Sequence, residues 1–324
     1  MGTRLFAWML QQDNPLIRDA AEWFQAEFAP VSDAEDFFSR IQAVIDDFEN
    51  GTPEQRRLRT VTANELHYLL EGLRTWFSQI RISGAPAYRT FANDIVEPGD
   101  CIVTFNYDVS LDHELRRAGK WEVGNGYGFV IDGLPDNSPT TLLKLHGSTN
   151  WLALLFGGAT SDVVAVQGGA LGKRPVIGTA EIDFLGYDTL ADPLFARASA
   201  AVPPMILPAR SKRFFFDTSF GREWEDFWNS LWQQARQALQ NSKEVFVLGY
   251  SMPPADERAC ELLLTRPSRD VRVEIASGSQ TTKIVDRFRS SGLVNAAGAR
   301  ETYFESWVRN EGAKNSFADS QDNG

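Results

Sequence analysis

Four short apolar segments constrain the fold of this chain more than any other feature. Each is nearly continuous in hydrophobic residues and is bounded by turn residues: 101–105, 141–146, 244–250 and 271–276. Continuous rather than alternating hydrophobicity is typical of strands covered on both faces, as in a parallel sheet flanked by helices. Helical periodicity precedes the third segment, over 224–239, and follows it, over 257–264. We therefore predict an α/β fold with a doubly wound, mostly parallel, Rossmann-like sheet.

Helical patterns dominate the chain before this sheet. Four apolar residues recur at a spacing of four and are predicted to share one helical face: Leu16, Ala20, Phe24 and Phe28. Capping residues predict three further helix starts, at Ser32–Glu35, Thr52–Gln55 and Thr62–Glu65. The sequence therefore predicts an N-terminal helical region packed on the core.

Changes in composition suggest the domain limits. We assign residues 1–95 to the helical region and residues 96–310 to the Rossmann-type domain. Within that domain, residues 152–215 are rich in Gly, Ala and Pro and have poor periodicity, so we predict a loop or lid insertion of loops and small helices. The tail 311–324 is polar and is expected to be disordered.

Charge and hydropathy exclude several classes of protein. The formal net charge is -11, so we expect no extended basic surface and no direct nucleic-acid partner. No run approaches the ~18 uncharged apolar residues of a membrane span. The N-terminus has no small-residue cleavage site, so we expect a cytoplasmic protein with no membrane partner.

The cysteines and histidines do not predict a metal site. Cys101 and Cys260 cannot form a disulfide framework or a four-cysteine zinc site, and both are expected to be buried free thiols. The three histidines, His67, His113 and His146, show no metal-ligand spacing. The glycine-rich segment 124–129 opens no predicted helix, so we interpret it as a hairpin turn before a strand-like run and not as a phosphate loop.

Polar residues follow all four apolar segments. They are Asn106-Tyr107-Asp108, His146-Gly147-Ser148, Gly249-Tyr250-Ser251 and Ser277-Gly278-Ser279. Each alone has a structural explanation as a helix cap, a turn or a buried structural histidine. In an open parallel sheet, however, ligands bind beyond the carboxyl ends of the strands. Together, at one sheet edge, these residues predict a ligand site.

The motifs that carry these residues resemble a known family. VTFNYD (103–108), KLHGSTNW (144–151) and VFVLGYSMPPAD (245–256), in this order, resemble the sirtuin-like NAD-binding family. The resemblance is closer to its bacterial branch of NAD-hydrolysing defence proteins than to the protein deacetylases. LPARSKRF (207–214), followed by a tryptophan-rich helix, adds to it, and the likeness spans roughly residues 60–308.

The resemblance implies roles for particular residues. Asn106 and His146 would be catalytic. Thr104 and Asp108 would lie near the ribose of NAD. Three residues would line the nucleotide: Gly249, Ser251 and Ser277. NAD would be the substrate, with no metal, and the setting would be antiphage defence.

These residue types suit cleavage of the bond between nicotinamide and ribose. Nicotinamide is already a cationic leaving group in NAD, so its departure needs no general acid. The reaction needs a polar group that positions a water or ribose hydroxyl, which Asn106 can supply, and a base, which His146 can supply near neutral pH. Fixing the sugar and excluding bulk water matter most for the oxocarbenium-like state. We therefore expect an NAD glycohydrolase.

Two departures from the family leave an alternative open. The chain cannot build the four-cysteine zinc module of the deacetylases, so deacetylation of lysine is disfavoured. Nothing before Leu66 matches the glycine-rich loop that cradles the pyrophosphate at a helix N-terminus in this family. Either the start is truncated, or the chain is a degenerate member that binds NAD weakly. The alternative is thus a catalytically impaired NAD- or ADP-ribose-binding or scaffold protein.

Other functions and partners are less well defined. An unrelated nucleotide- or sugar-processing enzyme on a similar sheet ranks below both readings. NAD or ADP-ribose is the expected partner. The resemblance also leaves open a homo-oligomer or a separate trigger subunit.

Overall fold

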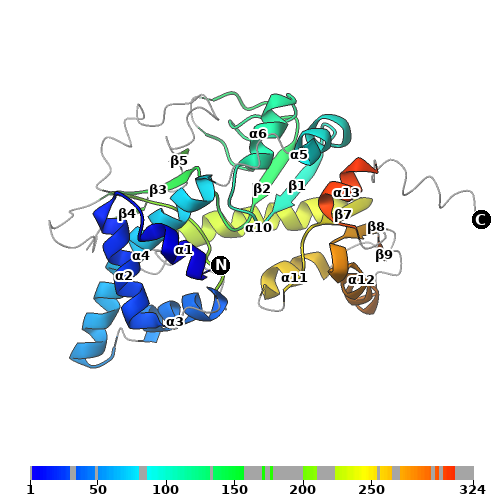
Figure 1. The fold of residues 1–324 in the computed structure, drawn as a ribbon. Helices are drawn as coiled ribbons and strands as arrows, with labels where there is room; N and C mark the ends of the chain where they lie inside the picture. The colour runs from blue at the N-terminus through cyan, green and yellow to red at the C-terminus, as the bar shows by residue number, and fades with distance from the viewer. Residues whose placement is uncertain are drawn as a thin grey trace, which may run out of the picture. The chain divides into compact units, whose positions relative to one another are not determined.

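The computed structural model describes residues 2–29, 34–47, 50–79, 86–131, 134–156, 170–171, 176–177, 200–209, 223–253, 256–264, 271–292, 296–298 and 302–310. Helices and strands are mixed along the chain, so the protein has an α/β fold (Figure 1). The chain divides into two compact units. Unit 1 comprises Met1–Arg81, Phe105–Val109 and Lys144–Asn229, and unit 2 comprises Ile82–Thr104, Ser110–Leu143 and Ser230–Gly324.

Unit 1 begins with four helices, coloured blue to cyan in Figure 1: α1 (Gly2–Met9), α2 (Pro15–Phe28), α3 (Ala34–Asp47) and α4 (Pro53–Gln79). Their core is an aromatic cluster in which Phe37 meets Phe6, Phe24 and Phe28 edge to face, at centroid distances of 5.3 to 6.1 Å. The predicted face of α2 is buried at Ala20, Phe24 and Phe28, but Leu16 is exposed in the first turn. The predicted helical character of the N-terminal part is therefore confirmed for the described residues.

Of the two helix starts predicted within 52–65, the one at Thr52–Gln55 is confirmed as the start of α4 and the one at Thr62–Glu65 is wrong. Thr52 and Gln55 form a reciprocal capping box. The backbone amide of Gln55 donates to Thr52 Oγ1 at 3.3 Å, and the backbone amide of Thr52 donates to Gln55 Oε1 at 2.8 Å. No helix starts at Thr62–Glu65, because α4 continues through it. Thr62 is buried, and its hydroxyl donates to the Leu58 carbonyl one turn earlier at 2.8 Å. The predicted start at Ser32–Glu35 lies partly outside the described residues.

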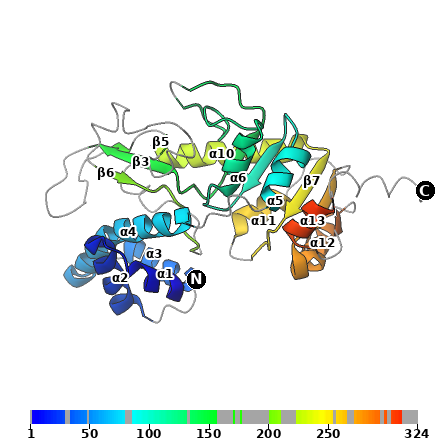
Figure 2. The same cartoon turned by 45° about the horizontal axis from the view of Figure 1, so that its top comes forward.

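Unit 1 also contains an antiparallel sheet that the sequence analysis missed. Strand β3 (Trp151–Phe156) pairs with β4 (Ala170–Leu171), β5 (Val176–Ile177) and β6 (Ala200–Val202), and Figure 2 shows β3 and β6 side by side. The prediction that 152–215 holds only loops and small helices is therefore wrong. Its strands are mostly two or three residues long, too short to give an alternating pattern.

Unit 2 contains the parallel sheet. Strand β7 (Glu244–Leu248), helix α11 (Glu257–Leu264), strand β8 (Arg272–Ala276), helix α12 (Thr281–Ser290) and strand β9 (Ala296–Gly298) form two consecutive βαβ units. The strand order is β7-β8-β9, and both pairs are parallel. The predicted strands 244–250 and 271–276 and the helix 257–264 are thus confirmed, whereas β9 was not predicted.

The rest of unit 2 includes a second, smaller sheet. Strand β1 (Cys101–Thr104) pairs with β2 (Thr141–Lys144), whose last residue is grouped with unit 1. Unit 2 also contains helices α5 (Pro86–Thr90), α6 (Ser110–Arg117) and α13 (Phe304–Arg309) and a π-helical turn (Phe91–Ile95). Among the described residues the strands form three separate sheets, and the βαβ sheet has three strands.

Helix α10 (Glu223–Asn241) confirms the predicted tryptophan-rich helix and buries Phe227, Trp228, Leu231, Trp232 and Ala235. Cys260 is buried as predicted. Cys101 is exposed at the first position of β1, so the prediction of a buried thiol is wrong there. Within the described part of the chain, no helix is both long and apolar enough to cross a membrane.

Candidate functional site

Two segments that carry predicted site residues lie together in unit 1. The Thr149 amide donates to the Tyr107 carbonyl at 2.9 Å, and the Ser148 hydroxyl approaches the same oxygen at 3.4 Å. The Lys144 ammonium donates to the Asp108 carbonyl at 2.6 Å. These bonds join 105–109 to 144–150 at both ends. Asn106, Asp108 and His146 are therefore brought into one part of the molecule.

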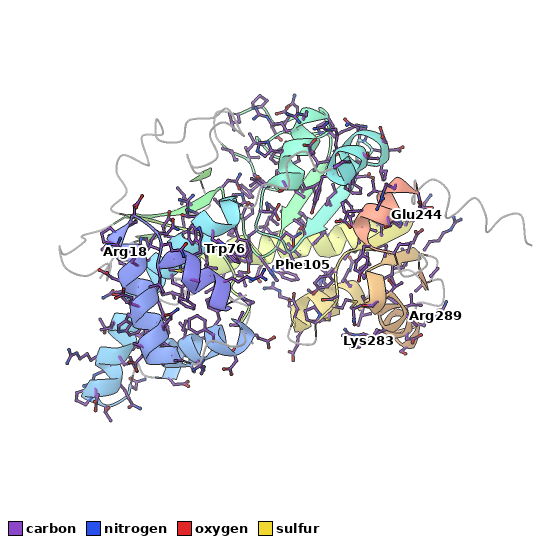
Figure 3. The ribbon with its side chains drawn as sticks, in the orientation of Figure 1. Arg18, Trp76, Phe105, Glu244, Lys283 and Arg289 are labelled. Atoms are coloured by element: carbon purple, nitrogen blue, oxygen red, sulfur yellow. The ribbon has the colours of Figure 1, made fainter. Side chains whose placement is uncertain are left out.

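His146 is held in an aromatic environment and is only 6% exposed. Its ring centroid lies 5.0 Å from that of Phe105, which Figure 3 labels, and 6.5 Å from that of Tyr107. Its backbone carbonyl accepts a hydrogen bond from the Ile206 amide at 2.9 Å. The imidazole is thus shielded from bulk water, and the main chain that carries it is anchored.

Glycine is required immediately after His146. Gly147 has φ +90°, and a Cβ at this position would lie 2.1 Å from the carbonyl oxygen of Pro204. Any other residue would combine a disfavoured backbone conformation with a clash against main chain that cannot move aside easily. The close approach of 203–207 to the His146-Gly147 turn therefore depends on this glycine.

The residues around this turn are unusually polar for their burial. Lys144, Ser148, Thr149 and Asn150 are all fully buried. Ser148 donates to Asn150 Oδ1 at 2.6 Å. Thr149 Oγ1 has no hydrogen-bond partner among the described residues. Burying a polar group costs free energy unless the group is hydrogen-bonded. A cluster of four buried polar side chains is therefore typical of a site at which polar groups serve a function.

Asn106 and Asp108 differ from His146 in exposure. Asn106 is exposed, and Asp108 is partly buried. Asn106 is therefore accessible to a small molecule from solvent. Thr104, the last residue of β1, is partly buried and belongs to unit 2.

The other predicted binding residues meet at the carboxyl edge of the unit 2 parallel sheet. Leu248 and Ala276 are paired at the ends of β7 and β8, and the Gly249 amide continues the ladder to the Ala276 carbonyl at 2.8 Å. The Ser277 hydroxyl donates to the Tyr250 carbonyl at 2.9 Å. Gly249 and Ser251 are exposed. The structure thus brings Gly249, Ser251 and Ser277 together at one sheet edge.

The loop after β7 is fixed by two side-chain hydrogen bonds and contains one strained residue. Met252 has φ 49°, the left-handed region that non-glycine residues rarely adopt, and its carbonyl accepts from Arg287 Nη1 at 2.6 Å. The Tyr250 hydroxyl donates to Asp256 Oδ2 at 2.9 Å. Burial, followed by the neighbouring Asp256 carboxylate, raises the pKa of Tyr250 above its usual value. Its phenol therefore remains a hydrogen-bond donor at neutral pH.

The predicted site residues fall into two groups. Asn106, Asp108 and His146 lie in unit 1, whereas Thr104 and the residues at the β7–β8 edge lie in unit 2. The sequence analysis assigned no role to Lys144, Tyr107 or Met252. A lysine within an apolar segment was a readable signal for Lys144, whereas no sequence pattern indicates the backbone of Met252.

Other motifs have structural roles. Residues 124–129 lie in turns and bends, and residues 130–131 directly after them are not in a strand, so the described part of the chain does not form the predicted hairpin there. Tyr127 in this segment is buried, and its hydroxyl donates to Asp112 Oδ1 at 2.5 Å. His67 lies on α4, where burial lowers its pKa, and His113 lies on α6. The described residues contain no group of three His, Cys, Asp or Glu side chains suited to a metal ion.

Comparison with known proteins gives no independent guide to function. The sequence matches no protein-family model, and a search of curated proteins returns no match. Functional inference therefore depends on the motifs and on the geometry of the residues that they contain.

Proposed function

We propose that this protein is an NAD glycohydrolase of the sirtuin-like type, with His146 and Asn106 as its catalytic residues. The observation that carries the proposal is the turn after β2, in which a buried histidine is fastened to the segment that presents an exposed asparagine. The proposal includes a doubly wound, Rossmann-like sheet, which the two consecutive parallel βαβ units of unit 2 support.

The residue types account for the chemistry. The bond between nicotinamide and C1′ of the ribose breaks, and its electron pair neutralises the cationic nicotinamide ring. A water oxygen forms the new bond to C1′ after Asn106 has positioned it, and His146 takes the proton that the water loses. The products are nicotinamide and ADP-ribose. The aromatic surroundings of His146 exclude other water molecules, which favours one oriented nucleophile.

The remaining residues would hold the nucleotide. Gly249 and Ser251 offer exposed backbone and a hydroxyl at the β7–β8 edge, where open α/β sheets bind ligands. Ser277 lines the same edge. Thr104 and Asp108 are proposed to lie near the ribose, as the family motif implies. A role in cytoplasmic antiphage defence, with a homo-oligomer or a trigger subunit, is part of the same proposal.

One observation favours a second candidate, an NAD- or ADP-ribose-binding or scaffold protein without turnover. The described residues before Leu66 contain helices and their connections but no strand followed by a glycine-rich loop and a helix. Such a loop would supply backbone amides to the pyrophosphate. A chain that binds the nucleotide only through the β7–β8 edge would have low affinity and little catalysis.

Release of nicotinamide from NAD tests the first candidate. The purified chain should release it, and His146→Gln should lower kcat by roughly 10²- to 10⁴-fold, the usual contribution of a general base. Asn106→Ala should lower kcat with little effect on folding, because its side chain is exposed. His113→Gln on α6 is the matched control and should retain activity.

The outcomes separate the two candidates. Activity that survives His146→Gln would contradict the assignment of the base. No nicotinamide release, combined with binding of ADP-ribose in a calorimeter, would favour the second candidate. If the chain neither releases nicotinamide nor binds ADP-ribose, both candidates are excluded.

A further inference from the structure

We propose that Tyr107 is a positioning residue that fixes His146 for catalysis through its phenolic hydroxyl. The proposal rests on the proposed function for its effect on rate, but its geometric part can be tested without turnover. Tyr107 lies between Asn106 and Asp108, so one short segment would supply both the residue that orients the nucleophile and the residue that orients the base.

The first connection runs through Ile206. The Tyr107 hydroxyl donates a short hydrogen bond to the Ile206 carbonyl. The Ile206 amide in turn donates to the His146 carbonyl at 2.9 Å. A single residue therefore joins the tyrosine side chain to the main chain of the histidine. Loss of the hydroxyl would release one side of Ile206 while leaving its bond to His146.

The second connection runs through the backbone of Tyr107. Its carbonyl accepts from the Thr149 amide at 2.9 Å, and the Ser148 hydroxyl lies 3.4 Å from the same oxygen; both residues follow His146 in the same turn. Tyr107 thus holds this turn from two directions, through 203–207 on one side and through 148–149 on the other. Because the turn also contains Gly147, which fits only by close contact with Pro204, a small displacement of 203–207 would be transmitted to His146.

The ring of Tyr107 provides a third contact. Its centroid lies 6.5 Å from that of His146, at an interplanar angle of 34°, and 5.2 Å from that of Phe77 on α4. Phenylalanine would preserve both ring contacts and remove only the bond to Ile206. Tyr107→Phe therefore isolates the hydroxyl from the packing role of the ring.

The matched control is Tyr127→Phe. Tyr127 is fully buried, whereas Tyr107 is partly buried, and the Tyr127 hydroxyl likewise donates one intramolecular hydrogen bond, to Asp112 in unit 2. Both variants lose one hydrogen-bonded phenolic hydroxyl, and the more deeply buried Tyr127 should lose at least as much stability, so a general loss of stability should affect both. Only Tyr107→Phe should change His146.

Proton NMR of the imidazoles gives a readout that does not require activity. The chain has three histidines, and the spectrum of His146→Gln identifies the His146 resonance. In Tyr107→Phe we expect the His146 ring resonances to move, while those of His67 and His113 stay unchanged. In Tyr127→Phe the His146 signals should match those of the wild type.

Kinetics give the second readout. Tyr107→Phe should lower kcat by roughly ten- to a hundredfold, as expected when a catalytic group is misplaced by a fraction of an ångström to 1 Å, and should leave KM nearly unchanged. An unchanged His146 spectrum, or a wild-type kcat in Tyr107→Phe, would overturn the proposal. If the wild-type chain releases no nicotinamide, the proposed function fails, and the NMR comparison alone decides whether Tyr107 positions His146.

Discussion

The turn after β2 and the turn after β7 hold polar residues in opposite ways. The first, Leu145–Asn150, is buried throughout and bonded to two other segments of unit 1. The second, Gly249–Met252, exposes Gly249 and Ser251 at the edge of a sheet. We refer to them as the closed turn and the open turn. Under the proposed function, the closed turn suits a base that must be fixed and kept dry, and the open turn suits contacts with a ligand.

The largest expected difference between the two turns concerns their glycines. Gly147→Ala should reduce the free energy of unfolding by about 3 kcal/mol or more, because a positive φ and a backbone clash combine. Gly249→Ala should cost only about 1 to 2 kcal/mol, because φ is +68° but no atom lies within 4 Å of the added Cβ. Urea denaturation of both variants measures the difference.

Equal losses in the two glycine variants would contradict the description of the closed turn as sterically tight. A greater loss in Gly249→Ala would reverse the comparison.

The serines provide the second test. Ser148→Ala removes a fully buried hydroxyl that donates to Asn150 Oδ1, so we expect a loss of about 1 to 3 kcal/mol. Ser277→Ala removes the bond to the Tyr250 carbonyl beside the open turn and should cost about 0.5 to 1.5 kcal/mol. Thermal unfolding of the two variants ranks them. A larger loss of stability in Ser277→Ala than in Ser148→Ala would contradict the contrast between the closed turn and the open turn.

The smallest expected effect is a pH dependence that arises at the open turn. The pKa of Tyr250 lies above 10 in the folded chain, chiefly because of burial and then because of Asp256. The folded state therefore holds the phenol proton more tightly than the unfolded state. The resulting stability is present below about pH 10 and is lost as the pH rises further.

Tyr250→Phe removes this titration. We expect the wild-type chain to lose stability more steeply than the variant between about pH 9 and pH 11. Urea denaturation at several pH values measures the two slopes. Parallel slopes would show that the Tyr250 proton is not linked to folding.

The same contrast explains what could be predicted from the sequence. The strands around the open turn, 244–250 and 271–276, are apolar runs, and their parallel pairing places Gly249 and Ser277 together as expected. Sequence patterns also predicted the capped start of α4 at Thr52, but not the continuity of this helix through Thr62. There a threonine and a glutamate at capping-box spacing lie in a helix interior, because a buried side-chain bond satisfies the threonine.

The closed turn was predictable only in part. His146 was singled out because a histidine ends an apolar run. That its turn is hydrogen-bonded to the segment 105–109, which contains Asn106, is known only from the structure. The contacts with Pro204 and Ile206 could not be predicted, since they join residues about sixty positions apart through main-chain atoms that no side-chain pattern specifies. The antiparallel partners of β3 were not predicted for a related reason, because pairing between such short strands depends on tertiary structure.

The geometry of Gly147 has a consequence for how this chain can diverge. Selection for the fold alone would preserve Gly147, because the backbone of the turn accepts no side chain there. It would constrain Asn106 less strongly, because this residue is exposed and no steric requirement fixes its side chain. Under the proposed function, descendants that retain the glycine but replace Asn106 would have kept the architecture and lost the chemistry, and descendants that retain both would mark the lineages in which the reaction is still under selection.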